Sequence, residues 1–89
     1  MTLQNSETME FMMRDFIQYI IIPRWRYAPE LGTYVSYDIA AFDSQWLAIV
    51  SVLQDVTTDR DLALRMTERF NRAQLAPCHL KEAVLDMLS

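Results

Sequence analysis

The sequence predicts an α+β fold, in which a three-stranded antiparallel meander is followed by a two-helix hairpin that packs on one face of the sheet. β-Branched and aromatic residues cluster between about residues 15 and 55, which is typical of strands. From Thr57 onward the apolar residues recur with the period of a helix. Because no repeat or linker interrupts the chain, we expect a single domain over residues 15–89. A Met-rich segment, residues 1–14, precedes it and is expected to be a short helix or disordered.

The first strand is expected to begin near Asp15, because Tyr19-Ile20-Ile21-Ile22 is a run of strand-forming residues. A helix over Ser6 to Ile21 competes with this prediction, and both alternatives stay open. The helix would have a polar face opposite an apolar face, formed by Glu7, Glu10, Arg14 and Gln18 and by Met9, Met12, Met13, Phe16 and Ile17.

Turn residues separate the remaining strands. Pro29 to Gly32 can bend the chain, and Gly32 can supply a positive φ at little cost. Alternate residues of the second strand are apolar, which is the period of a half-buried strand, and they are Val35, Tyr37, Ile39 and Ala41. A short polar break, Asp43 to Gln45, leads to a third strand, Trp46 to Leu53, that is apolar on both faces.

Two helices are expected after the strands. Thr58 and Asp61 have the spacing of a capping box at the start of the first helix. Its apolar stripe consists of Leu62, Met66, Phe70 and Ala73, and its opposite face carries acid–base pairs four residues apart, Asp61 with Arg65 and Glu68 with Arg72. Pro77 is well suited to begin the second helix. The apolar face of that helix is formed by Leu80, Ala83, Val84, Met87 and Leu88.

The strand TYVSYDIAA and the tail from Gln54 to Leu88 resemble a family of small bacterial proteins of unknown function, mostly from clostridia. In that family a tyrosine-containing strand precedes an "aspartate, hydrophobic, Ser/Thr, x, aspartate" helix start, and an "Asn, x, x, x, Leu, x, Pro, x, His, Leu" connection joins the last two helices. The matching positions here are Asp55, Val56, Thr57, Asp59, Asn71, Leu75, Pro77, His79 and Leu80. The resemblance covers about residues 34–88 and implies a three-stranded sheet with a helical pair, but no catalytic or binding residues.

The composition excludes several classes of protein. The longest apolar run, Phe16 to Pro23, is far shorter than the roughly 20 residues that cross a bilayer. Glu7 and Glu10 precede it, where a secretory signal would carry positive charge. A single cysteine cannot form an internal disulfide, which fits a reducing, cytoplasmic setting. We expect no membrane as a partner, and the net charge of −4 disfavours nonspecific contact with phosphate backbones or anionic lipid, although a local basic stripe stays open.

The neighbours Cys78 and His79 are the only cysteine and the only histidine of the chain. The amides at a helix start favour a thiolate, so a reactive Cys78 is one hypothesis. However, adjacent residues at a helix start point about 100° apart, whereas a nucleophile and its base must be within hydrogen-bond reach. One Cys and one His also fall short of the usual zinc ligands. We therefore expect no catalytic residue, metal site or cofactor, with Cys78 as a partly buried filler and His79 bonded to a nearby backbone group or carboxylate.

Basic residues give the sequence its second functional hypothesis. On a strand, Arg24 and Arg26 share one face and Trp25 and Tyr27 the other, so phosphate contact and base stacking would not come from one surface. The last two helices could also be a helix-turn-helix, but the second of them offers mainly acidic residues to a DNA groove. The carboxylates are expected mostly at turns and caps, without an acid–base pair among Asp38, Asp43, Asp55, Asp59 and Asp61.

The predicted sheet has more apolar surface than two helices can cover. If Ile17, Tyr19 and Ile21 face the helices, together with Val35, Tyr37 and Ile39, the alternate residues form an open apolar face. A patch of this kind usually marks an interaction surface unless the Met-rich segment folds over it. The expected surface consists of Phe16, Ile20, Ile22, Tyr34, Phe42 and Trp46.

The sequence therefore predicts a non-catalytic interaction or regulatory module that forms a homo-oligomer, such as a homodimer, or binds a protein partner through this face. The expected structural residues are Thr58, Asp61, Pro77 and His79. The alternative is a nucleic-acid-associated regulator that uses arginines of the first strand and first C-terminal helix, namely Arg24, Arg26, Arg60, Arg65, Arg69 and Arg72.

Overall fold

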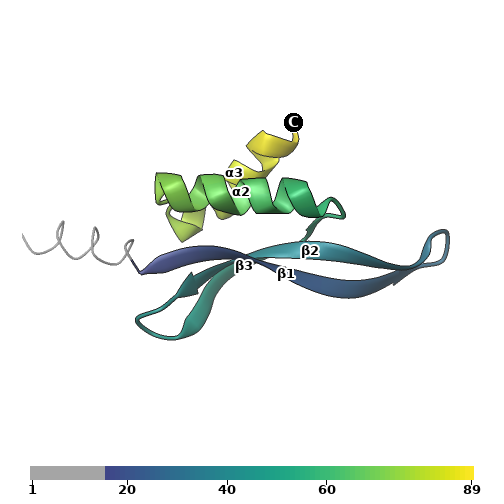
Figure 1. Cartoon of the computed structure of the whole chain (residues 1–89), viewed down its shortest axis with the longest axis horizontal. Helices are drawn as coiled ribbons and strands as arrows, with labels where there is room; N and C mark the ends of the chain where they lie inside the picture. The colour runs from purple at the N-terminus through teal and green to yellow at the C-terminus, as the bar shows by residue number, and fades with distance from the viewer. Residues whose placement is uncertain (1–15) are drawn as a thin grey trace, which may run out of the picture.

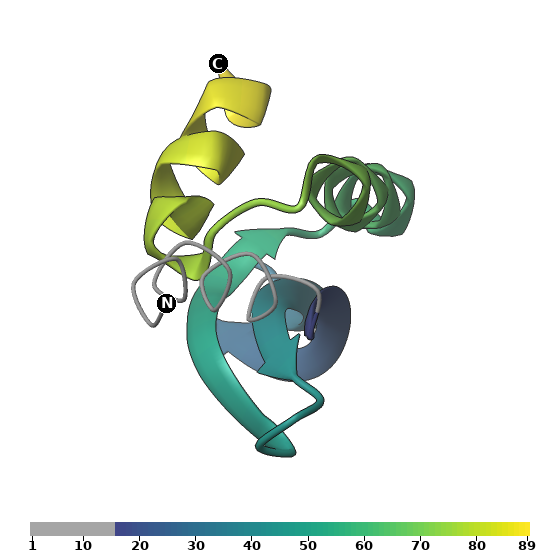
Figure 2. The same ribbon diagram turned by 90° about the vertical axis from the view of Figure 1, so that its left-hand side faces the viewer.

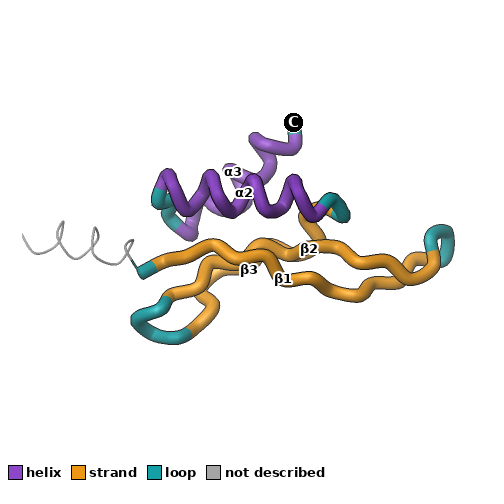
Figure 3. Tube along the Cα trace, in the orientation of Figure 1, coloured by secondary structure: helices purple, strands orange, loops and turns teal. Residues whose placement is uncertain are grey.

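The computed structural model describes residues 16–89. Three strands, β1 (Ile17–Ala28), β2 (Gly32–Asp43) and β3 (Ala48–Thr57), form an antiparallel sheet in the order β1-β2-β3 (Figures 1 and 3). They are followed by α2 (Arg60–Ala73), the short 3₁₀ helix η2 (Pro77–His79) and α3 (Leu80–Leu88). The predicted α+β class and element order are confirmed. The expectations for residues 1–14 lie outside the described residues, whereas the helical alternative for Ser6 to Ile21 is wrong from Ile17 onward, because those residues belong to β1.

The two turns follow the turn chemistry of the sequence. Gly32 has φ +74°, and the Leu31 amide donates to the Ala28 carbonyl over 3.0 Å. At the second turn Asp43 Oδ1 accepts from the Gln45 amide at 2.8 Å and from the Trp46 amide at 3.2 Å. These bonds hold Trp46 in the turn, so β3 begins at Ala48 and not, as predicted, at Trp46.

The helices cover one face of the sheet (Figure 1). Antiparallel partners share a face, and the pairs Tyr19–Ala41 and Ile21–Ile39 lie on the helix side. The buried core joins this side to the helices through Tyr19, Ile39, Ala41, Met66, Phe70, Leu80 and Val84. Of the six residues expected to face the helices, Ile17, Tyr19, Ile21 and Ile39 belong to this core or pack against it, whereas Val35 and Tyr37 do not. Figure 2 shows the sheet strongly curled, with β3 arching along one side.

The start of α2 differs from the prediction. Asp59, not Thr58, is the N-cap residue, because its backbone is extended and its Oδ1 accepts from the Leu62 amide at 3.2 Å. The Asp59 amide in turn donates to Thr57 Oγ1 at 3.0 Å. The predicted capping box of Thr58 and Asp61 is wrong by one residue, and Asp61 lies inside the first turn, where a carboxylate favours the helix dipole.

Pro77 begins η2, and the α-helical part of the last helix begins only at Leu80. The Leu75 amide donates to the Phe70 carbonyl at 3.0 Å, which closes the C-terminal turn of α2 before this connection. No helix within residues 16–89 is long and apolar enough to span a membrane.

Candidate interaction surface

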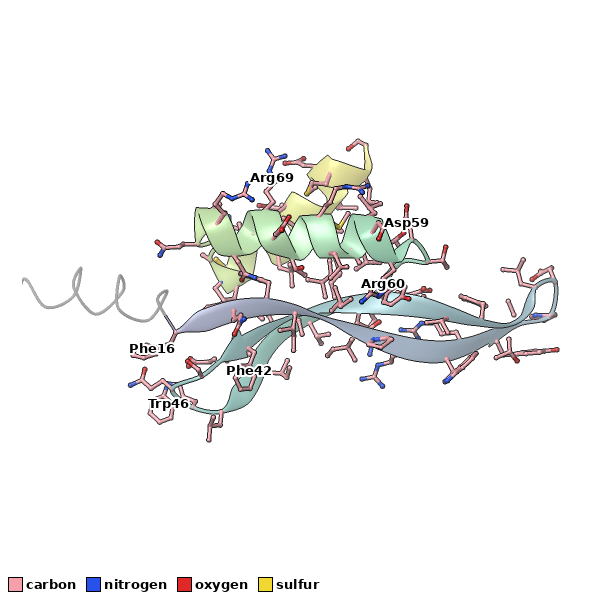
Figure 4. All side chains as sticks on the ribbon, in the orientation of Figure 1. Phe16, Phe42, Trp46, Asp59, Arg60 and Arg69 are labelled. Atoms are coloured by element: carbon pink, nitrogen blue, oxygen red, sulfur yellow. The ribbon has the colours of Figure 1, made fainter. Side chains whose placement is uncertain are left out.

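The sheet face opposite the helices is partly apolar. The register places Ile20 opposite Ala40, Ile22 opposite Asp38 and Arg26 opposite Tyr34 on this face. Of the six residues predicted for the interaction surface, only Trp46 is exposed, at 69%, while Phe16, Ile20, Ile22, Tyr34 and Phe42 are half-buried. Phe16, Phe42 and Trp46 gather at the end of the sheet that holds the β2–β3 turn (Figure 4). The predicted surface therefore narrows to one end of this face.

A buried carboxylate lies on the same face, in the middle of the sheet. Asp38 is fully buried in the middle of β2. Its Oδ2 accepts from Arg24 Nε at 2.8 Å, and its Oδ1 accepts from Arg26 Nη2 at 2.7 Å and from the Asp55 amide at 2.8 Å. Arg26 Nε donates to Ser36 Oγ at 2.7 Å. We call Arg24, Arg26, Ser36, Asp38 and Asp55 the Asp38 cluster.

The Asp38 cluster keeps its carboxylate ionised. Burial on its own raises the pKa of Asp38, but the hydrogen bonds from the Asp55 amide and from Arg24 and Arg26 outweigh it, so the pKa lies below its usual value. The Asp55 amide can reach Asp38 because β3 departs from regular pairing there and Asp55 has φ +55°. The Asp55 carboxylate lies 3.6 Å from Arg26 Nε.

The aspartates were expected mostly at turns and caps, but Asp38 is buried within β2 and paired with Arg24 and Arg26. The sequence did hold a signal, because a turn over residues 28–32 places Arg24 directly opposite Ser36 and two residues from Asp38. Cross-strand pairs of opposite charge are favourable, so a buried ion pair could have been inferred from the register. The prediction that the two arginines share a face opposite Trp25 and Tyr27 agrees with this register.

The outer edge of β3 and its preceding turn carry five of the eleven exposed large apolar side chains in the described chain. We call this surface the apolar edge; it consists of Trp46, Leu47, Ile49, Val50 and Val52. The least exposed of these side chains, Val52, is still 45% exposed. Within residues 16–89 no strand pairs with the outer side of β3. The strand therefore presents both apolar side chains and unpaired backbone groups to its surroundings.

The outer edge of β1, by contrast, is bound by a helix side chain at Tyr19, near the start of the strand. The Tyr19 amide donates to Asn71 Oδ1 at 2.7 Å, and Asn71 Nδ2 donates to the Tyr19 carbonyl at 3.1 Å. The Tyr19 hydroxyl donates to the Leu75 carbonyl at 2.7 Å, and its ring packs edge-on against Phe70. Burial, helped by the nearby charge of the Cys78 thiolate, raises the pKa of Tyr19 to about 12. Sequence reasoning missed these hydrogen bonds, because Asn71 and Leu75 lie 52 and 56 residues from Tyr19 along the chain.

The Cys78-His79 pair lies at the surface. Cys78 is exposed, so the expectation of a partly buried filler is wrong, because the single turn of η2 buries none of its residues. His79 Nδ1 lies 3.7 Å from Glu82 Oε1 within the same helical segment, so its side chain does not join the two helices. In the described part of the chain no three His, Cys, Asp or Glu side chains come together as metal ligands.

The arginines of α2 do not form one surface. Arg60 and Arg69 are nine positions apart, which is roughly 180° around a helix, and they point to opposite sides of α2 (Figure 4). Arg65, Arg69 and Arg72 line a shallow groove with Glu68 and Met87. The expected pairs Asp61–Arg65 and Glu68–Arg72 are absent from the ion pairs found among residues 16–89.

Comparisons with protein families, with curated proteins and with solved structures found no match to this chain. The features of the described chain that bear on its function are the apolar edge, the Asp38 cluster and the groove beside α2. We call this groove, lined by Arg65, Glu68, Arg69, Arg72 and Met87, the α2 groove.

Proposed function

We propose that this protein is a non-catalytic interaction or regulatory module that binds a protein partner through the apolar edge. The observation that carries this proposal is the exposure of five large apolar side chains on one unpaired strand edge and its turn, Trp46, Leu47, Ile49, Val50 and Val52. Exposed apolar patches on small domains usually mark sites of association. Phe16 and Phe42 extend the surface onto the open face at the same end of the sheet.

The charge distribution supports the same proposal. No charged side chain occurs from Ser44 to Gln54, although 22% of the chain is charged. Strand edges that stay free in solution usually carry lysine, proline or an inward-pointing charge that discourages pairing. β3 carries none of these between Ala48 and Gln54. This segment therefore has the composition of a contact surface, and we place the protein in the cytoplasm as part of the proposal.

The titratable groups support a role without catalysis. The carboxylate of Asp38 is buried beneath two arginines, where no substrate reaches it. His79 lies near Glu82, a second exposed side chain, and Cys78 lies in a turn whose residues are all unburied. A nucleophile with an oriented base would need a closer arrangement. Rapid reaction of Cys78 with a thiol reagent at neutral pH would argue against this part of the proposal.

The α2 groove supports a second candidate function, that of a nucleic-acid-associated regulator. Arg65, Arg69 and Arg72 line one groove with a single acidic neighbour, Glu68. Arg24 and Arg26 contribute less to this candidate than the sequence indicated, because both are bound to Asp38, whose carboxylate offsets part of their charge. If the candidate holds, DNA or RNA binding should weaken steeply with salt, and Arg69→Ala should reduce it.

The resemblance to the clostridial proteins remains a proposal. Two of its positions have structural roles that would explain such a motif: Asn71 binds the backbone of Tyr19, and the carbonyl of Leu75 accepts from the Tyr19 hydroxyl. A third, Leu80, belongs to the buried core. The proposal gives no catalytic or binding residue to this chain.

The proposed function is tested by copurification from the protein's own host. We expect the tagged wild-type chain to retain a partner or a second copy of itself that Val52→Lys loses. Leu31→Lys is the matched control, because Leu31 is exposed at the opposite turn of the sheet. Equal retention by both variants would remove the apolar edge as the interaction surface.

A further inference from the structure

The sheet face opposite the helices carries apolar side chains from all three strands. Phe42 of β2 pairs with Ile49 of β3. Two residues earlier in β2, Ala40 pairs with Ile20 on one side and with Val52 on the other. Cross-strand partners share a face, and so do residues two apart in a strand, so these side chains form one surface. Phe16 extends it at the end that holds the β2–β3 turn (Figure 4). We call this surface the open-face patch; it consists of Phe16, Ile20, Ala40, Phe42, Ile49 and Val52.

The open-face patch is uncharged and only partly buried. Ile49 is 46% exposed and Val52 is 45% exposed, while Phe16, Ile20 and Phe42 are half-buried. Within residues 16–89 both helices pack on the other face of the sheet, so neither of them covers this patch (Figure 1). An apolar surface of this kind favours a cover that is itself apolar.

The chain enters the sheet at the rim of the open-face patch. The Phe16 carbonyl accepts from the Ser44 amide at 2.9 Å, which fixes Phe16 beside the β2–β3 turn. Fifteen residues precede Phe16, enough for about 22 Å of helix or about 50 Å of extended chain. The patch spans only about 10 Å across three strands and about 13 Å from Phe16 to Ile20. The preceding residues can therefore reach all of it.

We propose that residues 1–14 of the same chain bind the open-face patch and compete there with the protein partner. Met9, Met12 and Met13 have the spacing i, i+3, i+4 of one helix face, and methionine side chains adapt to irregular apolar surfaces. Attachment at Phe16 makes this binding intramolecular, which gives the segment a high effective concentration at the patch. The inference rests on the proposed function, because Ile49 and Val52 also belong to the apolar edge, and it names the regulation of that surface.

The cover is measured by the rate at which iodoacetamide alkylates a cysteine placed in the patch. Val52→Cys in a Cys78→Ser background gives the full chain a single thiol. This thiol reacts only while the patch is uncovered, so changing Met12→Gln and Met13→Gln together should raise the rate at least about threefold. Leu3→Gln, which removes an apolar residue outside the methionine pattern, should leave the rate unchanged. Equal rates with and without the two methionine changes would overturn the inference.

Two controls separate the cover from other effects. Leu31→Cys in the same background lies at the opposite turn of the sheet and should react at one rate whichever segment sequence is present. Circular dichroism should show that all variants are folded. The rate at Val52→Cys should be the same from about 1 µM to about 100 µM protein, because the cover is intramolecular. A rate that falls with concentration would assign the cover to another copy and overturn the proposal.

The two proposals fail in different ways. In the host copurification, the chain with both methionine changes should retain more of the partner that Val52→Lys loses. A partner that depends on Val52, combined with alkylation rates that ignore the methionines, would reject the cover and keep the interaction surface. Faster alkylation without any partner that depends on Val52 would keep the cover and reject the proposed function.

Discussion

The two edge strands of this sheet differ in how their outer edges are bound and in which side chains they expose. β1 is closed by the Asn71 side chain at Tyr19 and carries Pro23 and two arginines that bind Asp38. β3 is open and carries exposed Ile49, Val50 and Val52. A three-stranded meander necessarily has two edges, and unpaired edges invite association. The comparison teaches that this chain places its polar interactions at one edge and leaves the other available for a partner.

The largest effect is expected when the Asp38 cluster is broken. Asp38→Ala leaves the Asp55 amide without its acceptor and two arginines without their counter-charge, so we expect a loss of about 2–4 kcal/mol in the free energy of unfolding. Denaturant titration measures it. Asp55→Ala is the control, because its half-exposed carboxylate lies 3.6 Å from Arg26 and should contribute less than about 1 kcal/mol.

The same cluster should make the protein sensitive to acid. The pKa of Asp38 is lowered in the folded state, so its contribution to stability is present above the unfolded pKa and is lost as the pH falls through the folded value. Wild type should therefore lose more stability on acidification than Asp38→Ala. An identical pH dependence in the two proteins would contradict this account of the cluster.

The free energy of unfolding should fall at high pH because the Tyr19 hydroxyl ionises. The pKa of Tyr19 is raised to about 12 from 10.0, so its contribution is present below pH 10 and is lost as the pH rises from 10 through 12. Two pKa units correspond to roughly 2–3 kcal/mol. Denaturant titrations between pH 9 and pH 12 measure the loss. Tyr19→Phe has no phenol to titrate and should show a smaller decline over the same range.

A smaller effect is expected from opening the β1 edge directly. Asn71→Ala removes two hydrogen bonds to the Tyr19 backbone, groups that water can partly reach at an edge, so we expect a loss of about 1–2 kcal/mol. Amide hydrogen exchange at Tyr19 should also become faster. Glu68→Ala, an exposed change on the same helix, should alter neither measurement. An unchanged exchange rate in Asn71→Ala would show that the Asn71 side chain does not protect the Tyr19 amide at this edge.

The smallest effect concerns the start of the helix that carries Asn71. Asp59→Ala removes the N-cap hydrogen bond to the Leu62 amide and should cost about 1 kcal/mol. Thermal unfolding measures it. Thr58→Ala should have little effect, since Thr58 is not the cap residue. The reverse order of the two losses would restore the capping box expected from the sequence.

The sequence by itself determined the elements and their order. Strand-forming runs, the turn at Gly32 and the helical stripe of Met66 and Phe70 are local patterns, and each identifies its element without knowledge of the rest of the chain. Alternation along the strands also predicted that Ile17, Tyr19, Ile21 and Ile39 face the helices, but not that Val35 and Tyr37 lie outside the core. Element ends were less certain, because Asp59 and Thr58 compete for one cap position and only the folded backbone selects between them.

Only the tertiary structure decided the contacts between distant parts of the chain. Asn71 reaches Tyr19 across 52 residues, and Asp38 collects donors from both neighbouring strands. No local sequence pattern predicts either contact, because one depends on strand register and the other on where α2 crosses β1. The same folding decided which apolar residues stay exposed: it half-buries Phe42 on the curled open face and leaves Val52 at an unpaired edge. Hydrophobicity specifies that a residue prefers burial, but only the packed chain fixes how much partner surface is available to bury it.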